Sequence, residues 1–346
     1  MIFWYELKKI LSGIALWVFV LLCIAFNIWS MPRHFGGVPD TTTPFPINVF
    51  EGYNASTIAE DYIRVLRLTG GVADGMRAKY AALQEAIDAR AIAEDSYSPY
   101  FGEYSFRMHQ NLFHRISIGG VMGRLLLQGV AIAVLLTLLC LGYEQINGTE
   151  LNVYATKTGR RVLRHKIAAS LVAGVGLYAL LTAVTLAVYF NAFDYSDVWG
   201  SSVSSGFNFI DSVTGARPFI TWFSFTVASF LLAFIGVSAW LVVCFALMGV
   251  VVGLFSRNSY IAFLMVLVVN AVCFVLPAVF SINSYGRYFA FHSPIWLWWN
   301  SGWWFTDGGP VTLWRNFELW GTGISFFVLA TICVFAVKKF EKRDIT

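Results

Sequence analysis

Apolar residues form six long runs along the chain, and polar segments separate them. Several runs approach or exceed ~18 residues, the length of helix that crosses the ~30 Å hydrocarbon core of a bilayer. We therefore predict an all-α integral membrane protein with six transmembrane helices. The fourth run would be about 55 Å long as one helix, so either it protrudes or its start is an interfacial segment. The runs cover residues 14–29, 120–142, 167–190, 219–255, 260–280 and 318–337.

Residues 1–13 precede the first run and place Phe3, Leu7 and Ile10 near one helical face. With Lys8 and Lys9 turned toward water, this pattern suits an amphipathic helix at the membrane interface. A plain positive flank is the alternative. Residues 1–30 thus form an interfacial helix followed by the first span.

Residues 31–119 are polar and form a second unit between the first two spans. The segment from Thr57 to Glu60 has the spacing of a capping box and predicts a helix through about Leu68. Gly70 and Gly71 break that helix. An Ala-rich second helix follows over residues 72–94, and a third is expected over 104–118. We expect a small helical domain outside the cell.

Residues 282–317 hold an unusual density of tryptophan, the residue that concentrates at the membrane–water interface. Proline and glycine in the same segment prevent one continuous span. We expect an outer re-entrant region of short helices dipping into the outer leaflet. Its candidate gate residues are Trp296, Trp298, Trp299, Trp303 and Trp304.

The composition agrees with a membrane protein, since 58% of residues are hydrophobic and only 13% are charged. The five cysteines all fall within apolar runs, where they suit helix packing rather than disulfides. The net charge is +4. Its positive part gathers in segments expected inside the cell, so it indicates orientation rather than nucleic-acid binding.

The loop over residues 143–166 is the most basic stretch and fixes the topology. Lys and Arg are retained on the cytoplasmic side, so this loop and both termini are predicted to be cytoplasmic. We expect a multi-pass protein of the plasma membrane, bacterial in origin. The loop could instead merely anchor on anionic lipid headgroups. The topology anchors are Lys157, Arg160, Arg161, Arg164 and Lys166.

No catalytic or metal-binding motif is present. The chain has no phosphate-cradling P-loop, no zinc-protease motif and no nucleophile elbow, so we expect no enzyme activity of its own. Arg124 and Glu318 lie near span ends, where snorkelling suffices. Asn270 and Asn27 are expected to link helices, while Gly249 and Gly253 form a GxxxG packing motif.

Several stretches in order resemble the membrane subunit of the ABC type-2 exporters. The resemblance covers most of the chain except residues 31–119, which are longer than in compact members. It includes the amphipathic start, the aromatic stretch before the last span, and the ending over residues 340–345. The loop between the second and third spans also resembles that of the family. The residues that carry this resemblance are Glu144, Gly148, Thr149, Glu150, Leu151, Ala155, Thr156, Arg160 and Lys166.

That resemblance implies a coupling helix seated on a separate cytoplasmic ATPase, with Tyr154 among the coupling residues. ATP and Mg would be bound by that partner, and a second permease copy, identical or different, would complete the assembly. Membrane lipid is the other expected partner, and nucleic acid is not one. We expect export of amphipathic peptides such as a toxin or bacteriocin, or peptide immunity. The alternatives are a non-transporting sensor subunit, or export of lipid-linked or drug-like cargo.

Overall fold

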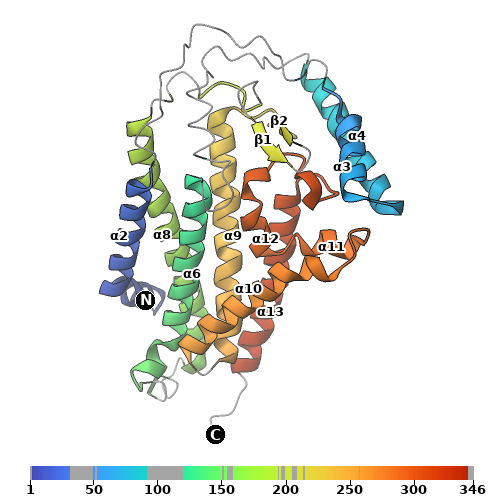
Figure 1. Cartoon of the computed structure of the whole chain (residues 1–346). Helices are drawn as coiled ribbons and strands as arrows, with labels where there is room; N and C mark the ends of the chain where they lie inside the picture. The colour runs from blue at the N-terminus through green and yellow to red at the C-terminus, as the bar shows by residue number, and fades with distance from the viewer. Residues whose placement is uncertain are drawn as a thin grey trace.

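The structure is a computed structural model. It describes residues 2–31, 50, 53–91, 112, 120–149, 152–153, 159–193, 195, 199–204, 209–212, 215–256 and 258–341. Long helices lie side by side in a bundle, with smaller elements gathered at one end (Figure 1). The loop after α6 and the C-terminal end of α13 lie at the opposite end, which we call the terminal end.

The long helices follow the predicted apolar runs closely. The bundle consists of α2 (Ile14–Trp29), α6 (Val121–Ile146), α8 (Val162–Ala192), α9 (Val227–Phe255), α10 (Ser259–Val279) and α13 (Phe317–Glu341). Five of them are long and apolar enough to cross a membrane. The sixth crossing requires α1 (Ile2–Leu11) together with α2, and the two are bent by 59°. The chain is therefore a multi-pass membrane protein.

The fourth apolar run does not form one long helix. Helix α9 begins only at Val227, because Thr226 and Ser229 cap each other's backbone in a capping box. A single helix over residues 219–255 is therefore wrong. Residues 219–226 are extended instead, and Thr221 pairs with Thr306 in an isolated bridge.

A two-stranded antiparallel hairpin lies just before this extended segment. Strands β1 (Phe209–Ser212) and β2 (Gly215–Pro218) pair with Phe209 opposite Pro218. They are the only paired strands in the part of the chain that the structure describes. The expected all-α class therefore holds for the bundle and needs this small addition.

Helices α3 (Ala55–Leu66) and α4 (Gly70–Ala91) form a helical hairpin at the end of the bundle opposite the terminal end. Asn54 caps α3 by accepting from the backbone of Ser56 and Thr57, so the expected capping box at Thr57 is wrong by three positions. Arg67 ends α3 in the left-handed region. Gly70 begins the next helix rather than only breaking the chain. The third expected helix falls outside the described residues, apart from position 112.

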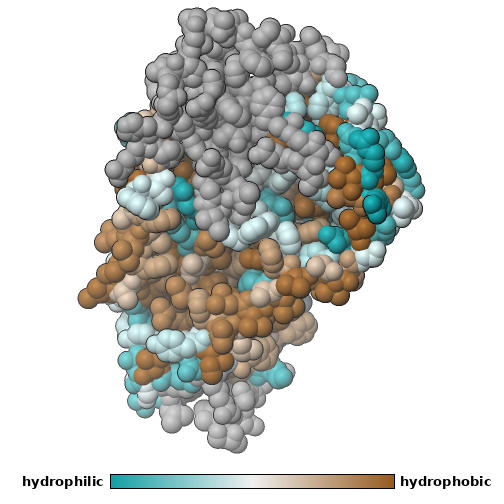
Figure 2. Space-filling view, viewed as in Figure 1, coloured by the Kyte–Doolittle hydropathy of each residue, from teal (hydrophilic) through white to brown (hydrophobic). Residues whose placement is uncertain are grey.

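Helix α6 is the centre of the bundle and packs against both α8 and α9. Gly129 allows the close approach to α8, since a Cβ there would lie 2.4 Å from the Tyr178 ring. Gly249 and Gly253 of α9 face Thr137 and Leu138 of α6, where the absence of a Cβ lets the two helices approach closely. By contrast, α10 crosses the bundle obliquely and leaves most of its apolar side chains exposed (Figures 1 and 2).

The short elements near the α3–α4 hairpin replace a continuous span with a compact cap. They are α11 (Tyr285–Ala290), α12 (Pro294–Trp299) and two 3-10 turns, η3 (Ser301–Trp303) and η4 (Gly309–Val311). Phe305, Gly308 and Gly309 have positive φ angles, a conformation that favours glycine and occurs in tight turns. The prediction of short helices in this segment is confirmed.

Candidate functional sites at the two ends of the bundle

A buried group of four charges joins three helices at the terminal end. Lys9 of α1 lies 2.6 Å from a carboxylate oxygen of Glu6 and 2.7 Å from Glu144 Oε1 on α6. Lys166 of α8 binds the other oxygen of Glu144. Glu144 is only 7% exposed and Lys166 only 6%. Two acids and two bases balance, which is the condition under which charges are tolerated away from water.

This cluster corrects the expectation that both N-terminal lysines face water. Lys8 is exposed, but Lys9 is nearly covered, and its ammonium also lies 4.4 Å from the centre of the Tyr143 ring. Lys166 likewise points into the protein instead of toward lipid headgroups. The root of the loop is therefore fixed to α1 by charge as well as by packing.

Beyond this root, the chain turns sharply and becomes exposed. Gly148 has a positive φ of 65°, which suits glycine at the end of a helix. The backbone N–H of Thr149 donates to the backbone carbonyl of Glu144, and that of Val153 donates to the carbonyl of Thr149 in a helical pattern. The remaining predicted coupling residues, Glu150, Leu151, Tyr154, Ala155 and Thr156, lie outside the described residues.

The basic half of the loop divides into different environments. Arg164 makes two hydrogen bonds to Glu341 of α13, at 2.8 and 2.7 Å. Arg161 is exposed, and Arg160 lies in the short 3-10 turn η2 (Gly159–Arg161). Lys157 lies outside the described residues. Of the predicted anchors, Arg161 and Arg164 therefore lie at the surface, whereas Lys166 is buried.

A second buried polar network lies at the opposite end, and we did not predict it from the sequence. Lys79 of α4 is 4% exposed and donates to three backbone carbonyls of the segment before α13. The distances are 3.1 Å to Asp307, 2.7 Å to Gly309 and 2.9 Å to Thr312. Burial lowers the pKa of Lys79 to about 7, although Asp307 acts in the other direction.

The Asp307 side chain extends this network to the β-hairpin. Its carboxylate accepts from Tyr80 at 2.5 Å and pairs with Arg217 of β2 at 3.2 Å. Arg217 also donates to Tyr62 of α3 at 2.5 Å. Burial would raise the pKa of Asp307, but Arg217 and Lys79 outweigh it and hold this pKa below its ordinary value. Asp307 therefore remains charged.

Apolar contacts surround this network, so the α3–α4 hairpin does not stand alone. Its buried side chains form one core with Ile220, Trp222, Tyr288 and Leu313 from the outer loops. Tyr285 adds a hydrogen bond of 2.8 Å to the carbonyl of Gly71. The hairpin is thus docked on three segments that lie far away in sequence.

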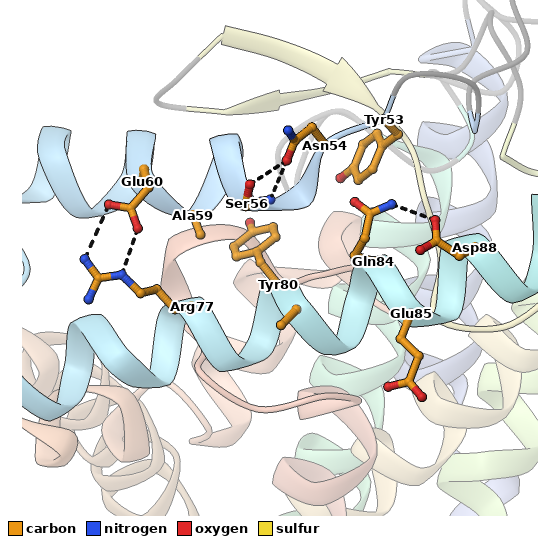
Figure 3. A pocket seen from close by; sticks show the side chains of 11 residues that line it. Tyr53, Asn54, Ser56, Ala59, Glu60, Arg77, Tyr80, Gln84, Glu85 and Asp88 are labelled. Carbon is orange, nitrogen blue, oxygen red and sulfur yellow. Dashed lines mark hydrogen bonds and ion pairs between the residues drawn. The ribbon is translucent and has the colours of Figure 1, made fainter.

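A groove of about 970 Å³ runs along α3 and α4, and Tyr80 of the buried network is among its lining residues. Figure 3 shows Glu60 of α3 and Arg77 of α4 bridging one end of it by two hydrogen bonds. At the other end, Gln84 donates to Asp88 within α4. The Glu60–Arg77 pair therefore joins the two helices, whereas the Gln84–Asp88 bond stays within α4.

The tryptophans of the aromatic stretch mostly face the protein rather than the membrane–water interface. Trp304 is fully buried and donates to Leu297, and Trp298 donates to the carbonyl of Gly123 on α6. Trp296 stacks on Phe274 with ring centres 4.6 Å apart. Trp303 is partly buried, and only Trp299 is exposed. These side chains wedge α12 into the bundle, whereas we had expected an interfacial belt.

Polar residues within the bundle serve two different purposes. Asn27 exchanges hydrogen bonds with Gln128 of α6 and donates to Thr185 of α8, which confirms its helix-linking role. Asn270 donates mainly to its own helix at Val266 and makes a 3.3 Å contact with the Met248 sulfur.

Glu318 contradicts the expectation that it snorkels to the surface. It is fully buried, and neither carboxylate oxygen has a hydrogen-bond partner. The first turn of α13 packs beneath the cap of short helices, so the side chain has no route to water. It is the single buried carboxyl of this kind among the described bundle helices.

A signal for the outer network was present in the sequence. Lys79 follows Met76 and precedes Leu83 at helical spacing, on the apolar stripe of α4. A lysine on such a stripe requires buried acceptors, although the stripe does not reveal where they are.

Comparison with known proteins gives no relative. No family model matches the chain, and no curated protein or solved structure matches it significantly. Among the described residues, no three His, Cys, Asp or Glu side chains form a metal-binding group.

Proposed function

We propose that this chain is the permease subunit of an ATP-driven ABC exporter in the plasma membrane of a bacterium. A separate cytoplasmic ATPase would bind ATP and Mg, and a second permease copy would complete the membrane path. The chain itself would supply no catalytic residue. Its coupling helix would lie in the loop that begins at Gly148.

The buried cluster around Glu144 carries this proposal. An exposed turn transmits force only if its root is stiff, and Lys9 and Lys166 hold that root to α1 and α8. A push on Gly148 and Thr149 would therefore move three helices together. An anchor on lipid headgroups would need surface charge but no such buried root.

Co-purification with candidate ATPases tests the proposal, followed by measurement of ATP hydrolysis with and without cargo. Thr149→Trp should abolish cargo stimulation of hydrolysis while leaving membrane insertion normal. Arg161→Trp is the matched control, since it places the same bulk in the basic half of the loop. Equal effects of the two variants, or no ATPase bound by the unaltered chain, would remove the coupling assignment.

We propose amphipathic peptides as the cargo class, including toxins, bacteriocins or peptides against which the cell needs immunity. The support is the scarcity of ionised groups in the described spans and the aromatic content of the cap. Peptide should stimulate ATP hydrolysis by the purified complex in a saturable manner. Stimulation by lipids or drugs alone would favour lipid-linked or drug-like cargo.

A sensor subunit is the second candidate, and the docked α3–α4 hairpin favours it. Lys79 ties this hairpin to the segment that leads directly into α13, so a ligand that moves the hairpin would also pull on a span. Deleting residues 35–115 separates the two functions. A transporter would keep basal export, whereas a sensor would lose its whole response.

A further inference from the structure

A groove of about 570 Å³ opens between α10 and α13 in the half of the bundle nearest the cap. Both helices pack against α9 far more than against each other. Val269 and Cys273 line one wall, Ile324 and Ser325 line the other, and Met248 of α9 contributes to the lining. The volume lies within the usual range for small-molecule sites.

The groove is continuous with the lipid-facing surface. Leu276, Trp320 and Val328 line it and are also exposed on the outside of the bundle. Since α10 and α13 have the length and composition of membrane spans, this exposed surface faces hydrocarbon. An occupant would therefore enter sideways from the bilayer.

The end of the groove beside the cap is lined by polar side chains, and an arginine lies on the helix next to it. Ser293 lines it, and its hydroxyl is buried without a hydrogen-bond partner. Arg287 lies on α11, the helix that supplies Phe289 to the lining, and its guanidinium lies 5.7 Å from the centre of the Phe291 ring. Arg315 follows Trp314, another lining residue, but its guanidinium lies 5.2 Å from the ring centres of Trp222 and Phe223, which do not line the groove. Neither arginine forms an ion pair with a described carboxylate.

We propose that this groove binds one anionic phospholipid, with an acyl chain between α10 and α13 and the phosphate beside Arg287. Association within a membrane gains little from the hydrophobic effect, because lipid tails are as apolar as the groove. Selectivity must therefore come from packing and from the headgroup. A phosphate matches an arginine that pairs with no carboxylate among the described residues, and the ester and phosphate oxygens of a lipid suit the Ser293 hydroxyl.

Photocrosslinking in nanodiscs tests this assignment on the full chain. The probes are phosphatidylglycerol and phosphatidylcholine, each with a diazirine in one acyl chain. Phosphatidylglycerol should label Cys273 and Ser325 several-fold more than phosphatidylcholine does. Arg287→Gln should reduce this preference several-fold, and Ser325→Trp should abolish groove labelling by filling the space. Phe327→Trp is the control, because it places the same side chain on the exposed outer side of the same helix.

Three results would overturn the proposal. One is uniform labelling around the exposed faces of α10 and α13. Another is labelling that does not depend on the headgroup. The third is chain-to-chain crosslinking through a photoreactive residue at position 325, which would assign the groove to a second copy. The experiment needs no ATPase, so its outcome is independent of the proposed transport function.

Discussion

The ammonium group of Lys79 lies 2.7 Å from the carbonyl oxygen of Gly309, a residue 230 positions further along the chain. This hydrogen bond joins a helix inserted between the first two spans to the segment that precedes the last one. Both groups are shielded from water, so each depends on the other for a partner. Their separation would leave a charge and three carbonyls unsatisfied.

Replacing this lysine should loosen the docked hairpin. Lys79→Met keeps much of the apolar stem but leaves the carbonyls of Asp307, Gly309 and Thr312 without a donor. We expect a loss of about 3 kcal/mol, seen as a lower midpoint of thermal unfolding in detergent. Arg64→Met is the control, because its exposed ion pair with Asp61 contributes under ~1 kcal/mol. Equal effects would show that the network adds no stability.

The same lysine should make the stability of the docked hairpin rise with pH in the alkaline range. Its pKa is about 7 when buried, against 10.5 when the hairpin is released. Between these values the unfolded chain holds more protons, so stability should rise with pH by at most about 1.4 kcal/mol per unit. The neutral amine can still donate to two of the three carbonyls. Below pH 7 this contribution is flat. Lys79→Met should remove the rise, and a slope that persists in this variant would assign it to another group.

The charge cluster at the terminal end should be equally intolerant of change. Glu144→Gln leaves Lys9 and Lys166 buried beside each other without their shared carboxylate. We expect a loss of about 3 kcal/mol in the free energy of unfolding. Glu341→Gln is the matched control, since its partner Arg164 is exposed to water. Thermal midpoints of the two variants would settle the comparison, and a tolerant Glu144→Gln would contradict a stiff root.

Close packing between α6 and α8 gives a steric prediction. Gly129→Val should force the helices apart, because its Cβ would meet the Tyr178 ring at 2.4 Å. Gly176→Val on α8 meets no atom within 4 Å and controls for the change in helix propensity. We expect a loss of about 1–3 kcal/mol for the first variant beyond the second. Tyr178→Ala should recover part of it, and failure to do so would place the strain elsewhere.

Glu318 should behave in the opposite way from these residues. A buried carboxyl without a partner costs free energy, so Glu318→Leu should raise stability by about 1–3 kcal/mol. Loss of activity in this more stable variant would identify Glu318 as a functional group retained at a cost. A lower unfolding midpoint would instead mean that the carboxyl group has a stabilising partner.

The spans were readable from the sequence because an apolar run in a bilayer has few alternatives to a helix. The first run and α2 have the same bounds, and the fifth run differs from α10 by one residue at each end. The start of α9 was also readable, since Thr226 and Ser229 stand at cap spacing. We missed that signal because the cap residues lie inside a continuous apolar run, which we read as one segment.

The burial and pairing of the charged residues could not be predicted in the same way. Glu144 has partners 135 positions before it and 22 positions after it, and no local pattern specifies such a pairing. Glu318 shows the same limit, because its depth depends on where the cap of short helices folds over α13. Sequence gives the chemistry of these residues, whereas the tertiary structure decides whether water reaches them.

The bend between α1 and α2 has a consequence for the surrounding bilayer. Helix α2 has 16 residues and so spans only ~24 Å, short of the ~30 Å that the lipid tails occupy. At 59° to α2, the ten residues of α1 add ~8 Å of depth. The hydrophobic mismatch is relieved without local thinning of the bilayer if α1 sinks below the headgroups. The four charges of the Glu144 cluster would then lie at the depth of the acyl chains, where dissolved salt does not screen them.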